Sequence, residues 1–251
     1  MPPEGRRPDG AVGHGPAFTG ADPFAAPEHW TGTDIWHVEL RGDSGGVERH
    51  ARALSEDEKR RAGEFRFESD VSRYVIAHGA LRDILARYVM REAGDLRFSV
   101  TSSGKPVLEP RGDSAEPMFS LAHSADIALI AVSRACDVGI DVEQVNPELD
   151  LRSIGRRCFS ANELERLRSD PPSTYVENFF TFWTRKEAYV KGIGEGLSAP
   201  LTEIDVSTAP VHPGGDWIVR DVPVRAGYRG AVATRGGPGS DRTFRYEDLA
   251  P

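Results

Sequence analysis

Apolar and polar positions alternate in several short stretches of this chain, as they do in strands that bury one face. Residues 34–40 form the first such stretch, and turns rich in Gly, Pro, Ser and Asp separate the later ones. In the middle of the chain we predict strands at residues 96–100, 118–121, 127–133 and 138–142. Near the C-terminus the alternation predicts strands at residues 203–207, 217–224 and 228–234.

Helical patterns lie between these stretches. Two capping-box pairs, each a Ser followed three residues later by Glu, predict helix N-termini: Ser55 with Glu58, and Ser160 with Glu163. The first pair opens a charged helix to about residue 65, and a second helix with apolar residues at helical spacing follows from Asp70 to Gly94. A longer helix covers residues 175–191, because Gly192 and Gly194 then end it. This order of elements predicts an α+β fold.

The start of the chain shows neither the two-residue period of a strand nor the 3.6-residue period of a helix. Residues 1–29 are rich in proline and alternate neither as a strand nor as a helix, which predicts a flexible N-terminal tail. The folded part should therefore begin near Trp30. Strands, helices and strands recur in its two halves, a hint of duplication without a residue-level repeat.

Composition and charge exclude several classes of protein. The chain has 251 residues, 39% of them hydrophobic, and no apolar run near the roughly 20 residues of a membrane span. Its first residues lack a signal-peptide core, so we predict a cytoplasmic protein that does not enter a membrane. The net charge of −8 argues against nucleic-acid binding. Cys136 and Cys158, without a Cys-x-x-Cys partner, predict free thiols.

The first candidate for chemistry is the strand at residues 138–142. Residues two apart on a strand share a face, so Asp141 and Glu143 project together while Ile140 and Val142 face the core. Two adjacent carboxylates suit a hard cation such as Mg²⁺ held together with phosphate oxygens. Taken alone, the pair fits a solvated strand edge equally well.

The second candidate lies on the long helix. Glu187 and Lys191 are four residues apart and share a helix face, where they could simply form a surface pair. Trp183, one turn earlier on the same stripe, is costly to leave in water. The stripe should therefore face a cleft or the core.

Two turns carry the remaining candidates. Lys105 stands between Gly104 and Pro106, in a turn that could equally hold an ordinary solvated lysine. His123 follows a strand, in the sequence Phe-Ser-Leu-Ala-His-Ser, where the ring could either cap the backbone or contact a ligand. Neither residue alone indicates a function.

The order of these blocks is more specific than any one of them. They are Gly-Lys-Pro at 104–106, Phe-Ser-Leu-Ala-His-Ser at 119–124, Gly-Ile-Asp-Val-Glu at 139–143 and Trp-x-x-Lys-Glu-x-x-x-Lys at 183–191. In this order they resemble the 4'-phosphopantetheinyl transferase superfamily, in its two-lobed, surfactin-synthetase-activating type. The resemblance covers residues 54–201, with a continuation at 228–232.

This resemblance implies two similar α/β lobes in a pseudo-twofold arrangement, with the active site at their interface. The N-terminal lobe would span residues 30–117 and the C-terminal lobe residues 118–251, and the chain would act as a monomer. The implied reaction moves 4'-phosphopantetheine from coenzyme A to a serine of an apo acyl or peptidyl carrier protein. Adenosine 3',5'-bisphosphate leaves, and Mg²⁺ is required. Polyketide, peptide and fatty acid synthesis all use such carriers.

The resemblance also assigns roles by position. The implied metal ligands are Asp141, Glu143 and Glu187. The implied catalytic residues are Glu187, as general base, with Lys191 and Asp141. Contacts to coenzyme A fall on Arg61, Arg73, Gly104, Lys105, Pro106, Ser120, His123, Ser124 and Lys191. The basic run Arg152, Arg156 and Arg157 is a candidate rim for an acidic carrier protein, or else a solvated helix face.

The chain departs from the family pattern at two positions, which affects the adenine side. Ala122 stands where Ser or Thr often precedes the histidine, and Tyr74 stands where a small hydroxyl residue is common. Two other functions remain open at this point. The chain could bind coenzyme A as a non-catalytic scaffold or sensor, or it could hydrolyse coenzyme A without a protein partner.

Overall fold

The computed structural model describes residues 32–112, 115–196, 199–208, 211, 213–236 and 241–249. The predicted tail, residues 1–29, lies outside the described residues. The fold is α+β, as the sequence predicts.

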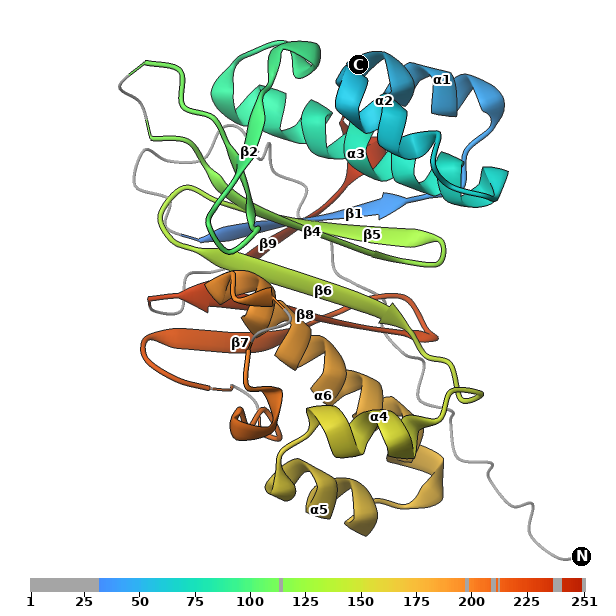
Figure 1. Ribbon diagram of the computed structural model, residues 1–251, viewed down its shortest axis with the longest axis vertical. Helices are drawn as coiled ribbons and strands as arrows, with labels where there is room; N and C mark the ends of the chain where they lie inside the picture. The colour runs from blue at the N-terminus through green and yellow to red at the C-terminus, as the bar shows by residue number, and fades with distance from the viewer. Residues whose placement is uncertain are drawn as a thin grey trace, which may run out of the picture.

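Helices α1 to α3 cover one face of a four-stranded sheet (Figure 1). The sheet has the order β4-β5-β1-β9, with strands Met118–Ser124, Ile127–Ser133, Thr33–Glu39 and Asp241–Arg245. The helices are α1 Ser44–Ala53, α2 Glu56–Ala62 and α3 Glu68–Val89. β1 is antiparallel to β5 and parallel to β9, so the last strand of the chain lies beside the first. Apolar residues of α3 pack on Trp36, Val38 and Ile130 in one core.

A second sheet lies against the other face of the first. It has the order β6-β8-β7, all antiparallel, with strands Val138–Gln144, Tyr228–Arg235 and Trp217–Val222. Residues of both sheets, Ile35 and Leu129 from one and Ile140 and Val232 from the other, share a core between them. Helix α6, Pro172–Ile193, covers the outer face of the second sheet, so the layers run helix, sheet, sheet, helix (Figure 1).

Smaller elements complete the chain. β2 Phe98–Val100 and β3 Pro106–Leu108 form a separate two-stranded hairpin, which is not hydrogen-bonded to either sheet as a further strand. Helices α4 Leu151–Cys158 and α5 Ala161–Ser169 join β6 to α6. One-turn 3-10 segments lie at Ala93–Asp95, Leu201–Glu203 and Tyr246–Asp248. None of the described helices combines the length and the apolar composition that a membrane span requires.

Most of the predicted elements are present. Both capping boxes form: Ser55 and Ser160 each accept a hydrogen bond from a backbone N–H three residues on and donate their own N–H to that glutamate. Strand β5 has the predicted bounds, and β4, β6, β7 and β8 differ from the prediction only at their ends. Cys136 and Cys158 are both free, as predicted.

Two predictions were wrong. Residues 203–207 are not a strand, because side chains take the hydrogen bonds that a neighbouring strand would need. Lys186 donates to the carbonyl of Ile204, and the N–H of Val206 donates to Glu163. Helix α3 ends at Val89 rather than near Gly94, because Met90 adopts a left-handed conformation, φ 51°, as the C-cap.

The division of the chain after residue 117 and the pseudo-twofold relation of two lobes stay predictions. Strands β4 and β5 follow residue 117 and pair with β1, so sheet pairing crosses that point in the sequence.

Candidate active site

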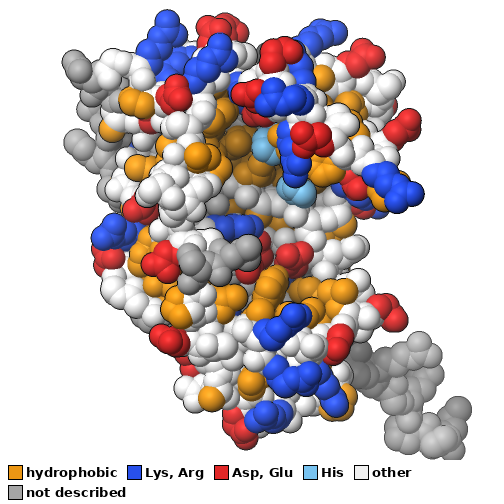
Figure 2. Space-filling model, viewed as in Figure 1, with side chains coloured by type: hydrophobic (Ala, Val, Ile, Leu, Met, Phe, Trp, Pro, Cys, Tyr) orange, Lys and Arg blue, Asp and Glu red, His pale blue; other side chains and the backbone are white. Residues whose placement is uncertain are grey.

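A cavity of about 670 Å³ lies between the β2–β3 hairpin, strand β4 and the end of α6. Six of the predicted site residues line it: Gly104, Lys105, Pro106, Ser120, His123 and Lys191. Phe98, Phe119 and Val190 supply apolar wall, and His78 and Glu58 add polar groups. Figure 2 shows histidine side chains on the wall of a hollow in this face. A larger cavity, about 1280 Å³, contains none of the predicted residues.

Lys105 joins the hairpin to α6. Gly104 has φ 89°, a conformation that glycine adopts without strain, and it turns the chain so that Lys105 points toward the helix. Lys105 Nζ donates to the carbonyl of Gly192 at 2.7 Å, and Asp137 lies 4.0 Å away. Burial lowers the pKa of Lys105, and Asp137 opposes that shift. The ammonium therefore stands at the cavity wall with one backbone partner.

His123 lies near basic residues from two helices. Burial lowers the pKa of His123, and His78, Lys191 and Arg73 lower it further. The lowered pKa favours the neutral imidazole, which has one nitrogen able to donate a hydrogen bond and one able to accept. Ser120, on the same strand, accepts a hydrogen bond from the N–H of Ile140 at 3.1 Å, so its hydroxyl ties β4 to β6.

Asp141 is the most buried of the predicted metal ligands, with 3% of its surface exposed. Its Oδ1 accepts from Lys191 Nζ at 2.6 Å, and its Oδ2 has no hydrogen-bond partner among the described residues. Burial raises the pKa of Asp141 to about 7, against the opposing effect of Lys191, and the charges of Glu143 and Glu187 add to the rise. A buried carboxylate oxygen without a partner is costly unless a cation or a proton meets it.

The charges of Glu187 and Glu143 act on Asp141, and that of Glu143 also acts on Glu187. Burial raises the pKa of Glu187, Lys191 opposes the rise, and the charge of Glu143 adds to it. Glu143 Oε2 accepts from the hydroxyl of Ser124 at 2.8 Å. The three carboxylates thus lie close enough to repel one another, and Lys191 is the nearest cation.

These carboxylates fit a hard divalent cation. In the described part of the chain no three His, Cys, Asp or Glu side chains are already arranged around one metal position. Asp141 and Glu143 instead turn toward Lys191 and Ser124. The free Oδ2 of Asp141 and the mutual repulsion of three acids are nevertheless what oxygen-ligated Mg²⁺ would relieve.

Two glycines in the motifs let α6 lie directly on β6. A Cβ atom on Gly139 would stand 2.1 Å from the carbonyl oxygen of Ala188 and 2.2 Å from the nitrogen of Gly192. A Cβ on Gly192 would meet the Trp217 ring at 2.6 Å. Because these positions lack side chains, the backbone of the helix approaches the strand closely enough to bring Lys191 to Asp141.

Three of the predicted contacts lie outside the cavity wall. Arg61 is exposed, where it pairs with Glu64 at 2.6 Å and lies over the Phe65 ring. Arg73 pairs with two aspartates near His123, and Ser124 is bonded to Glu143. Their contacts to coenzyme A stay predictions.

Sequence reasoning missed two groups at the cavity. His78 stacks on Tyr74 with ring centroids 4.0 Å apart, and Glu58 bonds to Arg82 at 2.7 Å. In the sequence, Glu58 is visible only as part of a capping box, and His78 only as one position of a predicted helix. Their shared exposure to one cavity depends on the packing of α2 on α3.

The chain matches two family models in succession. Residues 44–135 match the 4'-phosphopantetheinyl transferase N-terminal model, and residues 137–215 match the 4'-phosphopantetheinyl transferase superfamily model. The chain is 38% identical to the 4'-phosphopantetheinyl transferase HetI of Nostoc sp., over 71% of this chain and 75% of HetI. It is 34% identical to the 4'-phosphopantetheinyl transferase psf-1 of Bacillus pumilus, over 71% of this chain and 78% of the relative.

The similarity extends to the 4'-phosphopantetheinyl transferase Sfp of Bacillus subtilis, at 28% identity over 63% of this chain and 68% of Sfp. The matched segments include the cavity wall, the acidic strand β6 and helix α6. The chain therefore belongs to the 4'-phosphopantetheinyl transferase superfamily, in the type that Sfp represents.

Proposed function

We propose that this transferase moves the 4'-phosphopantetheine group of coenzyme A to a serine of an apo acyl or peptidyl carrier protein, and that it requires Mg²⁺. The observation that carries the proposal is the unpartnered Oδ2 of buried Asp141, beside Glu187 and bonded through its other oxygen to Lys191, which lines the cavity. A cavity of about 670 Å³ is also of the size that holds a ligand such as coenzyme A.

The reaction forms a bond between the serine Oγ and the β-phosphorus of coenzyme A and breaks the bond from that phosphorus to adenosine 3',5'-bisphosphate. Glu187 takes the serine proton, a role that suits a carboxylate whose pKa burial has raised. Lys191 offsets the charge that builds on the leaving group. Asp141, Glu143 and Glu187 would hold Mg²⁺, which when bound supplies further neutralisation of the pyrophosphate.

The carrier protein should approach beside this cavity. Helix α4 ends in basic residues, and Arg152, Arg156 and Arg157 are all exposed although the chain as a whole is acidic. A local basic surface steers an acidic partner whatever the net charge. These residues support a carrier protein as the acceptor. We propose in addition that the chain acts as a monomer in the cytoplasm.

One assay separates the proposed transferase from a coenzyme A scaffold and from a hydrolase. The full chain is incubated with coenzyme A, Mg²⁺ and a panel of apo-carriers, and the intact mass of each carrier is measured by mass spectrometry. We expect a gain of one phosphopantetheine group that disappears when the acceptor serine is replaced by alanine. Loss of coenzyme A without a carrier product would indicate a hydrolase, and binding without any turnover a scaffold.

Lys105→Ala should raise the KM for coenzyme A by roughly 10- to 100-fold, because a charge-assisted contact to phosphate contributes about 1.5–3 kcal/mol. We place this contact at the 3'-phosphate, since Lys105 lines the cavity from the hairpin and the family resemblance assigns it a contact to coenzyme A. Steady-state kinetics with coenzyme A and with dephospho-coenzyme A, which lacks that phosphate, measure the effect. The variant should discriminate much less between the two donors than wild type.

Arg60→Ala is the control for loss of a positive charge, because Arg60 is exposed on α2 and pairs only with Asp57 among the described residues. If Lys105→Ala weakens both donors by the same factor, Lys105 does not read the 3'-phosphate. Its bond to the Gly192 carbonyl would then be its main role.

A further inference from the structure

The turn between β4 and β5 is unusually constrained for a two-residue connection. Ser124 pairs with Ile127 across the hairpin, so Ala125 and Asp126 form the turn. Ala125 has φ 47°, a conformation that a residue with a Cβ seldom adopts unless its surroundings hold it there. The carbonyl of Asp126 accepts from the N–H of Leu40 at 2.8 Å, which fixes the turn to the end of β1.

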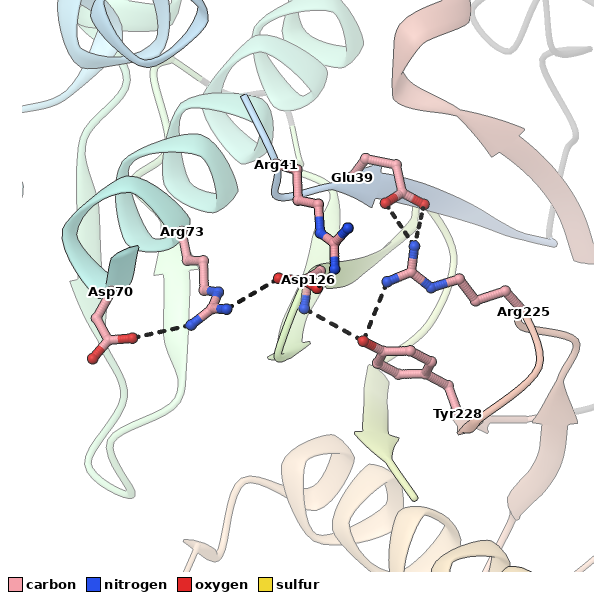
Figure 3. Close-up of polar contacts among 7 residues, drawn as sticks. All are labelled: Glu39, Arg41, Asp70, Arg73, Asp126, Arg225 and Tyr228. Carbon is pink, nitrogen blue, oxygen red and sulfur yellow. Dashed lines mark hydrogen bonds and ion pairs between the residues drawn. The ribbon is translucent and has the colours of Figure 1, made fainter. Parts of the chain in front are cut away.

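The carboxylate of Asp126 binds two arginines from different elements (Figure 3). Its Oδ1 accepts from Arg73 Nη2 of α3 at 3.0 Å, and its Oδ2 accepts a very short bond from Arg41. The side chain of Asp126 is only 14% exposed, and these two bonds hold its pKa below the usual value. Asp70, on the helix of Arg73, binds the other terminal nitrogen at 3.2 Å but is 42% exposed. Asp126 is therefore the less solvated of the two partners that orient Arg73.

The second sheet reaches the same turn. The N–H of Asp126 faces the hydroxyl of Tyr228, a buried residue of β8, at 3.5 Å. Arg225 donates to that hydroxyl at 3.2 Å and to Glu39 of β1 at 2.9 Å (Figure 3). Contacts from α3, from Leu40 and Arg41 just after β1, and from β8 thus converge on one aspartate.

This convergence lies next to the candidate active site. His123, which lines the cavity, stands three residues before Asp126, and the charge of Arg73 acts on its imidazole. Ser124, the residue between His123 and the turn, donates to Glu143. The two terminal nitrogens of Arg73 each donate one hydrogen bond, to Asp70 and to Asp126, and its other N–H groups can donate to an anion. A guanidinium held from two sides loses less entropy when it binds a phosphate.

We propose that Asp126 is a positioning residue, which holds Arg73 where its guanidinium meets the 3'-phosphate of coenzyme A. The inference rests on the proposed function. Asp126 itself does not touch the donor, so it should affect how coenzyme A binds and not how fast bound donor reacts.

Asp126→Asn keeps the size of the side chain and removes its charge. We expect it to weaken binding of coenzyme A about 10-fold and binding of dephospho-coenzyme A about 2-fold or less. Calorimetry on the full chain gives both dissociation constants. When Asp126→Asn is combined with Arg73→Gln, it should add almost no further loss of affinity for coenzyme A, because both changes disable the same contact. In the carrier assay the KM for coenzyme A should rise while kcat at saturation stays within about 2-fold.

Asp241→Asn is the matched control. Asp241 binds Arg220 through both oxygens, with 23% of its side chain exposed against 14% for Asp126, but it does not line the cavity. Equal weakening of both donors by Asp126→Asn, or full additivity with Arg73→Gln, would overturn the positioning role. In that case wild type would still modify carriers, so the proposed function would stand. Failure of wild type to bind coenzyme A would overturn both.

Discussion

Glu187→Gln should lower kcat by about 10²–10⁴-fold or more while the protein stays folded, because it removes a metal ligand and the general base together. Glu187 is half-buried on α6, and its side chain is not part of an apolar core. Asp141→Ala should also lose activity, because it removes a metal ligand. The rate of carrier modification at saturating donor and acceptor measures the loss, and thermal melting checks the fold.

The pH profile tests whether the ionised form of Glu187 is needed, either as the base or as a metal ligand. Burial raises the pKa of Glu187, so the wild-type rate should fall as the pH falls through that raised value. Glu187→Gln should lose this contribution and keep the one from Asp141, whose pKa burial raises to about 7. Glu177→Gln, a change on the exposed part of the same helix, should keep near-normal turnover. Turnover by wild type in excess EDTA, or by either site variant at the normal rate, would contradict the assignment.

Local patterns in the sequence predicted which side chains share a face better than how deeply those side chains are buried. Alternation along β6 placed Asp141 and Glu143 on one face, and the charge of Glu143 adds to the raised pKa of Asp141. The pattern could not tell that α6 and the motif glycines would cover that face. Both faces of β6 are buried as far as Val142, so Asp141 is not at a solvated edge. Burial is a property of long-range packing, which residue spacing does not encode.

The elements that the sequence missed are those with weak local signals. Helix α1 begins at Ser44-Gly45-Gly46, a run typical of a turn, and forms because Asp43 caps it by accepting from the N–H of Gly46 at 2.8 Å. Strand β9 is mostly polar and five residues long, and its parallel pairing with β1 is accompanied by two hydrogen bonds from Arg242 to Asp34. Such a contact joins residues too distant in the chain for any periodicity to predict.

The motif on α6 contains two lysines, Lys186 and Lys191, whose environments differ. Lys191 is half-buried and contacts Asp141, whereas Lys186 is fully buried and pairs with Glu163 at 2.8 Å. Lys186 also donates to the carbonyls of Leu201, at 2.6 Å, and Ile204. Lys186 stands inside the Trp-x-x-Lys-Glu-x-x-x-Lys block, and the sequence alone does not separate its role from those of Glu187 and Lys191. Its contacts assign it to the packing of α5 and the 201–206 segment on α6.

Lys186→Met should reduce the free energy of unfolding by about 3–5 kcal/mol, because it leaves the buried carboxylate of Glu163 without its ammonium. For a chain of this length that loss corresponds to a fall in Tm of about 6–20 °C. Urea unfolding at pH 7 gives the free energy, and thermal melting gives the Tm.

Lys191→Met makes the matched comparison, five residues along α6. It should cost activity and less stability than Lys186→Met, because Lys191 is 36% exposed and buried Asp141, whose pKa is raised to about 7, can take up a proton when its ammonium is lost. A double variant, Lys186→Met with Glu163→Leu, should recover much of the lost stability, because an apolar pair of similar size carries no desolvation cost. The two backbone N–H groups that now bind Glu163, from Ser160 and Val206, would lose their acceptor, so recovery should be incomplete. If Lys186→Met melts with wild type and loses only activity, Lys186 belongs to the active site, and the buried pair does not hold these elements together.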